Sequence, residues 1–202
     1  MTKNRLEAFS DGVLAIVITI MVLEMKVPHP HEGHDAALAD LKPILPVFLS
    51  YVLSFVYLAI YWNNHHHMLH ATKHVSGSVL WANMHLLFWL SLIPFVTGWM
   101  GENEFAAAPM ALYGVVLLMA AIAYFVLERS ILRVEGPDSV LAKAIGRDIK
   151  GKISPVLYIA GAGLAFVSPW ISGALYVLVA IMWLIPDRRI ERTLVAAEHT
   201  PR

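Results

Sequence analysis

Long apolar segments separated by short polar stretches form the main pattern of this sequence. A helix of about 20 predominantly apolar residues crosses the hydrocarbon core of a bilayer. By this length criterion the apolar pattern predicts six transmembrane helices, over residues 6–26, 43–68, 80–100, 108–127, 153–169 and 171–185. The last two are short and nearly continuous. The pattern therefore predicts an all-α integral membrane protein in which residues 1–202 form a single six-helix domain.

The composition agrees with this pattern and excludes several classes of protein. Of the 202 residues, 58% are hydrophobic and 15% are charged, whereas about 25% are charged in soluble domains. A soluble fold of this length cannot bury so much apolar surface, because small domains expose a large share of their residues. We therefore exclude a soluble enzyme, a nucleic-acid-binding protein and a disordered regulator. The absence of cysteine also excludes disulfides, thiolate metal sites and thiol nucleophiles.

The basic residues predict the orientation of the helices. Cytoplasmic loops of membrane proteins carry an excess of Lys and Arg. If both termini are cytoplasmic, 13 of the 15 Lys and Arg residues lie on the inner side, and only Lys26 and Lys42 lie outside. The outer connections instead carry Glu32, Asp35, Asp40, Glu102 and Glu104. We expect a multi-pass protein of the cell (plasma) membrane with cytoplasmic N- and C-termini.

The first segment differs from the others because carboxylates flank its apolar core. Only twelve uncharged residues separate Asp11 from Glu24. They span about 18 Å of helix, against a hydrocarbon core of about 30 Å. Intramembrane carboxylates normally face protein or water, since a charge in lipid is costly. We interpret this helix as internal, against a pore or a polar cluster; the alternative is a short tilted helix whose carboxylates mark the membrane interfaces.

An apolar stripe runs along the same helix. Ile16, Ile20 and Leu23 have the i, i+4, i+7 spacing that places side chains on one helical face. Thr19 lies close to the stripe and carries the only hydroxyl after Ser10 in this segment. Stripes of this kind usually pack against neighbouring helices, and the residues alone favour that interpretation.

The start of this helix resembles a known family. Residues 5–12 read Arg-Leu-Glu-Ala-Phe-Ser-Asp-Gly, which is similar to the Arg-x-x-x-Phe-Ser-Asp signature of the transmembrane protein 175 family of potassium-permeable channels. The apolar run that follows, the histidines closing the second segment and Leu92-Ile93-Pro94-Phe95 in the third also resemble its prokaryotic branch. The resemblance covers the whole chain. It implies a homotetramer of six-helix subunits, with the first helix lining a central pore.

The resemblance also implies roles for residues of the first helix. Ile16, Ile20 and Leu23 would form an apolar constriction that gates and selects, and Thr19 would be a polar pore-lining position. The structural signature would consist of Arg5, Phe9, Ser10 and Asp11, which tie the inner end of the helix to polar groups of the second and third helices. The partners it implies lie within residues 63–67 and at Trp81, Asn83 or His85.

A pore of this kind needs no loop filter, and the chain lacks the Thr-Val-Gly-Tyr-Gly sequence of potassium filters. A ring of branched apolar side chains forms a constriction that an ion passes only after losing water, or that closes by dewetting. The Thr19 hydroxyls would replace some lost water ligands, and the Glu24 carboxylates would concentrate cations at the outer mouth. We therefore predict passive conduction of potassium ions, with monovalent cations and the bilayer as partners and no cofactor, metal or nucleic acid.

A histidine cluster gives the alternative function. Five histidines lie near the end of the second segment, and His66 and His70 have the i, i+4 spacing that can place two ligands on one ion. The alternative is a six-helix zinc-type transporter that uses the His65–His74 cluster, namely His65, His66, His67, His70 and His74. However, residues 153–185 contain no Asp or Glu, and metal transporters usually carry such ligands at mid-membrane.

Two further features point away from catalysis. An intramembrane protease needs a Gly-x-Ser-Gly turn or a His-Glu-x-x-His helix, and the sequence contains neither. We therefore expect no enzymatic activity.

Tryptophans near the helix ends, including Trp62, Trp81, Trp99 and Trp170, are interpreted as interfacial anchors.

Overall fold

A computed structural model describes residues 2–29, 35, 37–137, 139, 141–142 and 149–184. Its elements are α1 (Lys3–Leu23), the 3-10 helix η1 (Leu38–Ile44), α2 (Leu45–His70), α3 (Gly77–Ser91), α4 (Ile93–Glu102), α5 (Ala107–Glu135), α7 (Ile149–Leu164) and α8 (Pro169–Leu184). If α3 and α4 are counted as one, these ranges contain the six helices that the sequence predicts, with no strand among them. The all-α class is thus confirmed.

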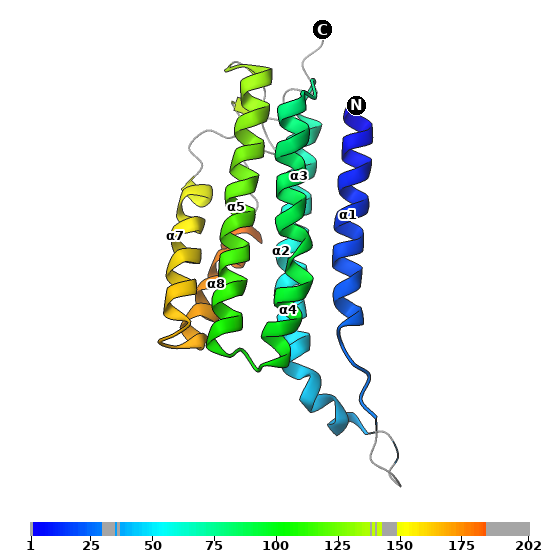
Figure 1. Cartoon of the computed structure of the whole chain (residues 1–202), viewed down its shortest axis with the longest axis vertical. Coiled ribbons are helices and arrows are strands. Elements are labelled where there is room, and N and C mark those ends of the chain that lie inside the picture. Colours follow the sequence, from blue (N-terminus) through cyan, green and yellow to red (C-terminus); the bar gives the residue numbers. More distant parts are fainter. Residues whose placement is uncertain are drawn as a thin grey trace.

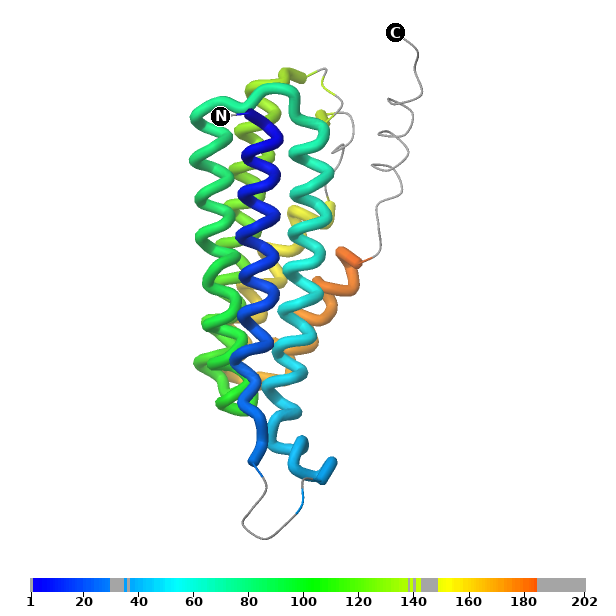
Figure 2. Tube along the Cα trace, turned by 90° about the vertical axis from the view of Figure 1, so that its right-hand side faces the viewer, coloured from blue at the N-terminus to red at the C-terminus, as the bar shows by residue number. Residues whose placement is uncertain are grey.

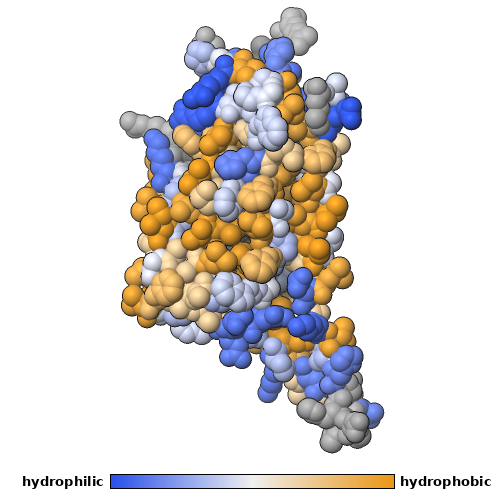
Figure 3. Space-filling view, in the orientation of Figure 1, coloured by the Kyte–Doolittle hydropathy of each residue, from blue (hydrophilic) through white to orange (hydrophobic). Residues whose placement is uncertain are grey.

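The helices pack side by side as a bundle (Figure 1). The middle of the bundle is formed by α2, α3 and α4, with α1 on one side and α5 on the other, and α7 and α8 lie on the side of α5 away from α1. Figure 2 shows α1 lying across the face that α2 forms together with α3 and α4. The face seen in Figure 3 carries an apolar belt between two hydrophilic ends, as expected for a protein that crosses a bilayer.

Four of the helical segments are long and apolar enough to cross a membrane: Lys3–Leu23, Leu38–His70, Gly77–Glu102 and Ala107–Glu135. The last two helices are shorter in the described part of the chain. Each of α7 and α8 has 16 residues, about 24 Å of helix, against a hydrocarbon core of about 30 Å. Figure 1 accordingly shows α7 beside only part of the length of α5.

The third predicted segment is interrupted between α3 and α4. Pro94 follows the break by two residues and has no N–H to donate to the carbonyl of Leu90. The chain bends into a short 3-10-type turn at Leu92, whose N–H donates to the Trp89 carbonyl at 3.3 Å. The sequence predicted one continuous helix here, and the proline is the physical reason for the difference.

Buried hydroxyl groups hold the middle of the subunit together. The Ser54 hydroxyl lies 2.6 Å from that of Thr97 and 3.0 Å from that of Tyr113. The Tyr57 hydroxyl donates to the Tyr176 carbonyl oxygen at 2.7 Å. Because buried polar groups are stable only when paired, these contacts fix the rotations of α2, α4, α5 and α8. They give α1 a rigid surface to pack on.

We expect Gly114→Ala to destabilise this core. The Tyr176 ring lies directly against Gly114 and Gly161, and a Cβ added at Gly114 would overlap the phenol group. Overpacking of a filled interior costs about 1–3 kcal/mol, so the midpoint of thermal unfolding in detergent will fall. Gly163→Ala is the matched control, because a Cβ there meets nothing within 4 Å. Equal midpoints for the two variants would contradict this packing.

Candidate functional site

Helix α1 packs on the bundle through one face only. Its buried residues are Leu6, Ser10, Leu14, Val17 and Met21, which recur every three or four positions and so lie along one side of the helix. This side contacts α2, α3 and α4. The rest of α1 has no covering element in the described part of the subunit.

The exposed side of α1 carries the residues that the sequence singled out. Ile16, Ile20 and Leu23 are 65%, 43% and 79% exposed, and Thr19 is exposed beside them. The stripe is therefore not the face by which α1 packs within its own subunit. We call Ile16, Thr19, Ile20 and Leu23 the α1 stripe. A row of apolar side chains with one hydroxyl, left open by the subunit, is available to line a conduit between subunits.

The Thr19 hydroxyl is oriented by its own helix. Its oxygen lies 2.9 Å from the Ala15 carbonyl oxygen and 3.1 Å from that of Ile16. A hydroxyl has a single proton, which is donated to the backbone here. The lone pairs of the Thr19 oxygen remain available on the exposed side, where they can meet a cation.

A buried hydrogen-bonded chain fastens the N-terminal part of α1. The Asn83 side-chain amide donates to the Ser10 hydroxyl oxygen at 3.0 Å, and His65 Nε2 lies 2.7 Å from Asn83 Oδ1. The Ser10 hydroxyl donates to the Leu6 carbonyl at 2.9 Å. All three side chains are buried. Among the partners considered from the sequence, the structure thus brings Asn83 of α3 to Ser10, and His65 of α2 to Asn83.

Asp11 has a partner that sequence reasoning missed. The indole N–H of Trp62 donates to Asp11 Oδ1 at 3.0 Å, whereas the sequence suggested that this tryptophan is an interfacial anchor. The sequence could have predicted such a contact from Asp11 itself, because a carboxylate at this depth needs a hydrogen-bond donor from a neighbouring helix.

The other two signature residues lie on the outside of the subunit. Arg5 is exposed, and it has no hydrogen bond or ion pair with the residues that the structure describes. Phe9 is also exposed. Of the four signature residues, Ser10 and Asp11 are the two that make side-chain hydrogen bonds to neighbouring helices within one subunit.

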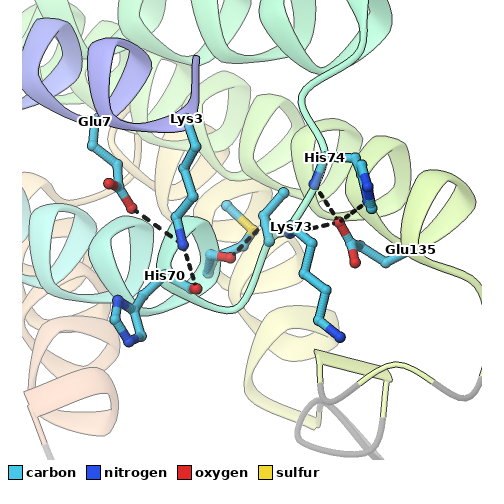
Figure 4. Close-up of polar contacts among 8 residues, drawn as sticks. Lys3, Glu7, His70, Lys73, His74 and Glu135 are labelled. Atoms are coloured by element: carbon cyan, nitrogen blue, oxygen red, sulfur yellow. Dashed lines mark hydrogen bonds and ion pairs between the residues drawn. The ribbon is translucent and has the colours of Figure 1, made fainter.

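Further contacts at the same end close the loop between α2 and α3 (Figure 4). Lys3 Nζ donates to the His70 carbonyl oxygen at 2.6 Å. The buried Glu135 carboxylate accepts the backbone N–H groups of Lys73 and His74 at 2.7 and 2.8 Å. The loop is therefore tied both to the start of α1 and to the end of α5.

The histidines at this end do not converge on one point. His65 belongs to the buried chain, while the rings of His66 and His70 stack on the exposed side of α2 with their centres 6.0 Å apart. Within the described ranges, no three His, Cys, Asp or Glu side chains are grouped so that they can hold a metal ion.

The C-terminal end of α1 lies beside an acidic groove of about 530 Å³. Ile16, Ile20 and Glu24 line one wall, and Phe95 and Glu102 of α4 line the other. Lys26 Nζ donates to Glu102 Oε1 at 2.9 Å, and this hydrogen bond and the charge of Glu102 raise the pKa of Lys26. Glu24 lies in the groove without such a hydrogen bond in the described part of the chain.

Comparison with known proteins identifies similar chains. The sequence profile of the family described as endosomal/lysosomal potassium channel TMEM175 matches residues 5–94. A potassium channel of Chryseobacterium sp. (strain P1-3) is 57% identical over 96% of this chain and 98% of its own. A potassium channel of Chamaesiphon minutus is 30% identical over 90% of this chain and 93% of its own. The crystal structure of a lysosomal potassium-selective channel TMEM175 homolog from Chamaesiphon minutus superposes with a TM-score of 0.76 and 29% identity, covering 91% of this chain and 96% of that one.

Proposed function

The chain belongs to the TMEM175 family and is a potassium channel, and we propose that its ions pass along the α1 stripe in a pore shared by several subunits. The observation that carries this proposal is the exposure of Ile16, Ile20 and Leu23 on a helix that packs by its opposite face. One such helix encloses no conduit, so the stripe lines a pore only where copies face one another across a symmetry axis. We propose a homotetramer, the assembly that the signature of residues 5–11 implies.

In this pore the α1 stripe supplies both resistance and selectivity. An ion that passes the rings of Ile16, Ile20 and Leu23 must lose part of its hydration shell. Potassium loses water more readily than sodium, so a preference for potassium follows without a cage of carbonyl oxygens. The outward lone pairs of Thr19 compensate part of the lost hydration. Conduction is passive, requires no bound cofactor and involves no catalysis.

We propose that the channel lies in the plasma membrane with its termini in the cytoplasm, and the charges at the two ends support this orientation. Lys3, Arg5 and Lys73 lie at one end of the bundle, with Arg129 and Arg133 in the last two turns of α5. Lys26 and Lys42 lie at the opposite end. This asymmetry agrees with the preference of cytoplasmic segments for basic residues. The C-terminal arginines lie outside the described residues.

The relatives favour potassium conduction over zinc transport by the His65–His74 cluster. The cluster agrees with this assignment, because His65 is engaged with Asn83 and no metal-holding group forms in the described ranges.

Flux from liposomes tests the function directly. Vesicles containing the purified channel are loaded with potassium or with sodium, and efflux down the gradient is measured. We expect efflux of both ions, faster for potassium, and no uptake of zinc. The absence of cation efflux together with zinc uptake would replace this function by the transporter alternative.

We expect Glu24→Gln to lower potassium conductance at low ionic strength. Carboxylates at a pore mouth raise the local cation concentration, and salt screens this effect over about 10 Å at 0.1 M. Conductance of the variant and of the native channel will therefore converge as potassium chloride is raised from about 0.01 M to 1 M. Glu104→Gln, a change at an exposed residue of the turn before α5, is the matched control. A deficit that persists unchanged at high salt would contradict the electrostatic role.

A further inference from the structure

A second cavity lies among α2, α5, α7 and α8. Its volume is about 60 Å³, and the rings of Tyr57, Tyr61, Tyr124, Tyr158 and Trp183 form much of its wall. No residue of the α1 stripe borders it. The cavity is therefore separate from the proposed pore.

Several polar side chains of the wall already have hydrogen-bond partners in the protein. The Tyr57 hydroxyl donates to a backbone carbonyl oxygen of α8 at 2.7 Å, and the Tyr158 side chain forms a hydrogen bond with Tyr57. The Ser154 hydroxyl donates to a backbone carbonyl oxygen of α7 at 2.8 Å and accepts the indole N–H of Trp183 at 2.9 Å. These four side chains need no further molecule to satisfy them.

Three more polar side chains of the wall, on α2 and α5, are also engaged. The Asn64 amide donates to the Ile60 carbonyl oxygen at 2.8 Å, and the Tyr124 hydroxyl donates to the Asn64 carbonyl oxygen at 3.4 Å. Glu128 also takes part in an interaction within the protein. One polar side chain of the wall then remains, that of Tyr61.

The Tyr61 hydroxyl makes no hydrogen bond with the residues that the structure describes. The residue is only 9% exposed, yet its oxygen is not fully enclosed by protein atoms. Because the side chain is buried on its other sides, this open surface faces the cavity. A buried donor without an acceptor is unfavourable. The cavity therefore favours a molecule that brings an acceptor atom to this hydroxyl.

The size and the walls of the cavity limit the ligand. A water molecule needs roughly 10–15 Å³ of such space, and benzene fits a cavity of about 150 Å³, so the cavity admits about three or four heavy atoms. Aromatic walls with a single free polar group favour an apolar body with one polar atom. We propose that the cavity binds a small neutral molecule with an acceptor oxygen, a short-chain ketone or alcohol, held by the Tyr61 hydroxyl and the surrounding rings.

Binding is measured without ion flux, so the result is independent of the proposed conduction. Acetone, a neutral molecule of this size with one acceptor oxygen, is the probe. The native channel in phosphatidylcholine nanodiscs is titrated with acetone, and saturation transfer from the protein to the acetone methyl groups is recorded by NMR. Empty nanodiscs of the same lipid give the contribution of the bilayer. We expect a saturable signal above theirs, and a signal that rises linearly and equals theirs would overturn the proposal.

Tyr61→Phe tests the hydrogen bond, because it removes the hydroxyl and keeps the ring. Loss of a neutral hydrogen bond is expected to weaken acetone binding by roughly fivefold. The matched control is Tyr51→Phe, since Tyr51 is a half-buried tyrosine of α2 that does not border the cavity, and it should leave the affinity unchanged. Native affinity in Tyr61→Phe, or an equal loss in both variants, would overturn the proposal.

Ala121→Leu tests the location of the site. Ala121 of α5 lines the cavity, and a larger side chain there occupies the space that the probe needs, so saturable binding should be lost. Ala108→Leu, at an exposed position of the same helix, is the matched control and should bind acetone as the native channel does. If Ala121→Leu does not fold, Tyr61→Phe decides alone. Unchanged acetone binding in a folded Ala121→Leu channel would overturn the proposal.

Discussion

Replacing Ile20 by Asn will raise potassium conductance and reduce the preference for potassium over sodium. Ile20 lies in the middle of the α1 stripe, and its side chain is 43% exposed in the subunit. In a symmetric pore the change puts an amide from every subunit into the constriction, where water and hydrated sodium are then tolerated. A barrier lowered by about 1.4 kcal/mol corresponds to a tenfold higher rate, so we expect an increase of roughly that size.

The measurement is the reversal potential with potassium on one side of the membrane and sodium on the other. It reports the permeability ratio of open channels and does not depend on how much protein is inserted. Val22→Asn is the matched control, since Val22 is similarly exposed on α1 but lies off the stripe. An unchanged ratio in Ile20→Asn, or an equal change in both variants, would remove Ile20 from the selectivity determinants.

The second large effect is expected from Asn83→Leu. Asn83 joins Ser10 of α1 to His65 of α2, and all three side chains are buried. The substitution removes the Asn83 partner of the buried His65 ring, at about 1–3 kcal/mol, and one of the two hydrogen bonds of the Ser10 hydroxyl. Typical domains have a free energy of unfolding of about 5–15 kcal/mol, so this loss is a substantial share. We expect a large drop in the thermal unfolding midpoint and a loss of assembled channel in detergent.

Two comparisons make this result specific to the buried chain. Asn103→Leu removes an exposed amide that donates to the Trp99 carbonyl at 2.9 Å, and its effect should be small. Adding Ser10→Ala to Asn83→Leu should cost less than the two single losses summed, because the residues share one interaction. Additive losses, or equal losses for Asn83→Leu and Asn103→Leu, would show that the chain does not hold α1 in place.

The apolar pattern of the sequence predicts the helices well, because bilayer thickness and helical rise leave few alternatives. The apolar pattern predicts the helix boundaries less well where a single residue interrupts the backbone hydrogen bonds of a helix. Pro94 divides the third segment into α3 and α4 through a missing backbone donor. In the part of the chain that the structure describes, α7 and α8 have 16 residues each and are shorter than the four candidate spans.

The site is harder to predict because it depends on the rotation of α1. Leu14, Val17 and Met21 have nearly the same helical spacing as Ile16, Ile20 and Leu23, so the sequence alone does not indicate which row is buried. The structure buries the first row and exposes the second. The interpretation from the residues alone, that such a stripe packs against neighbouring helices, is not met within the described part of the subunit.

The partners of the signature residues depend on the relative positions of three helices. The family resemblance implied a few polar residues as partners of the signature as a whole, and Asn83 and His65 were among them. Trp62 was not chosen as a partner of Asp11, because a tryptophan near a helix end is more often an interfacial anchor. Only the packing of α1 against α2 brings its indole N–H to that carboxylate.

The most direct test of the pore assignment uses the absence of cysteine from the chain. Single cysteines are introduced at Ile16, Ile20 and Leu23 and, as matched controls, at Leu14 and Val17 on the buried face of α1. Potassium current is recorded before and after addition of a positively charged methanethiosulfonate reagent. We predict block of the current in the stripe variants and no change at Leu14 and Val17. Block at the buried face but not at the stripe, or no block at either face, would contradict a pore lined by the α1 stripe.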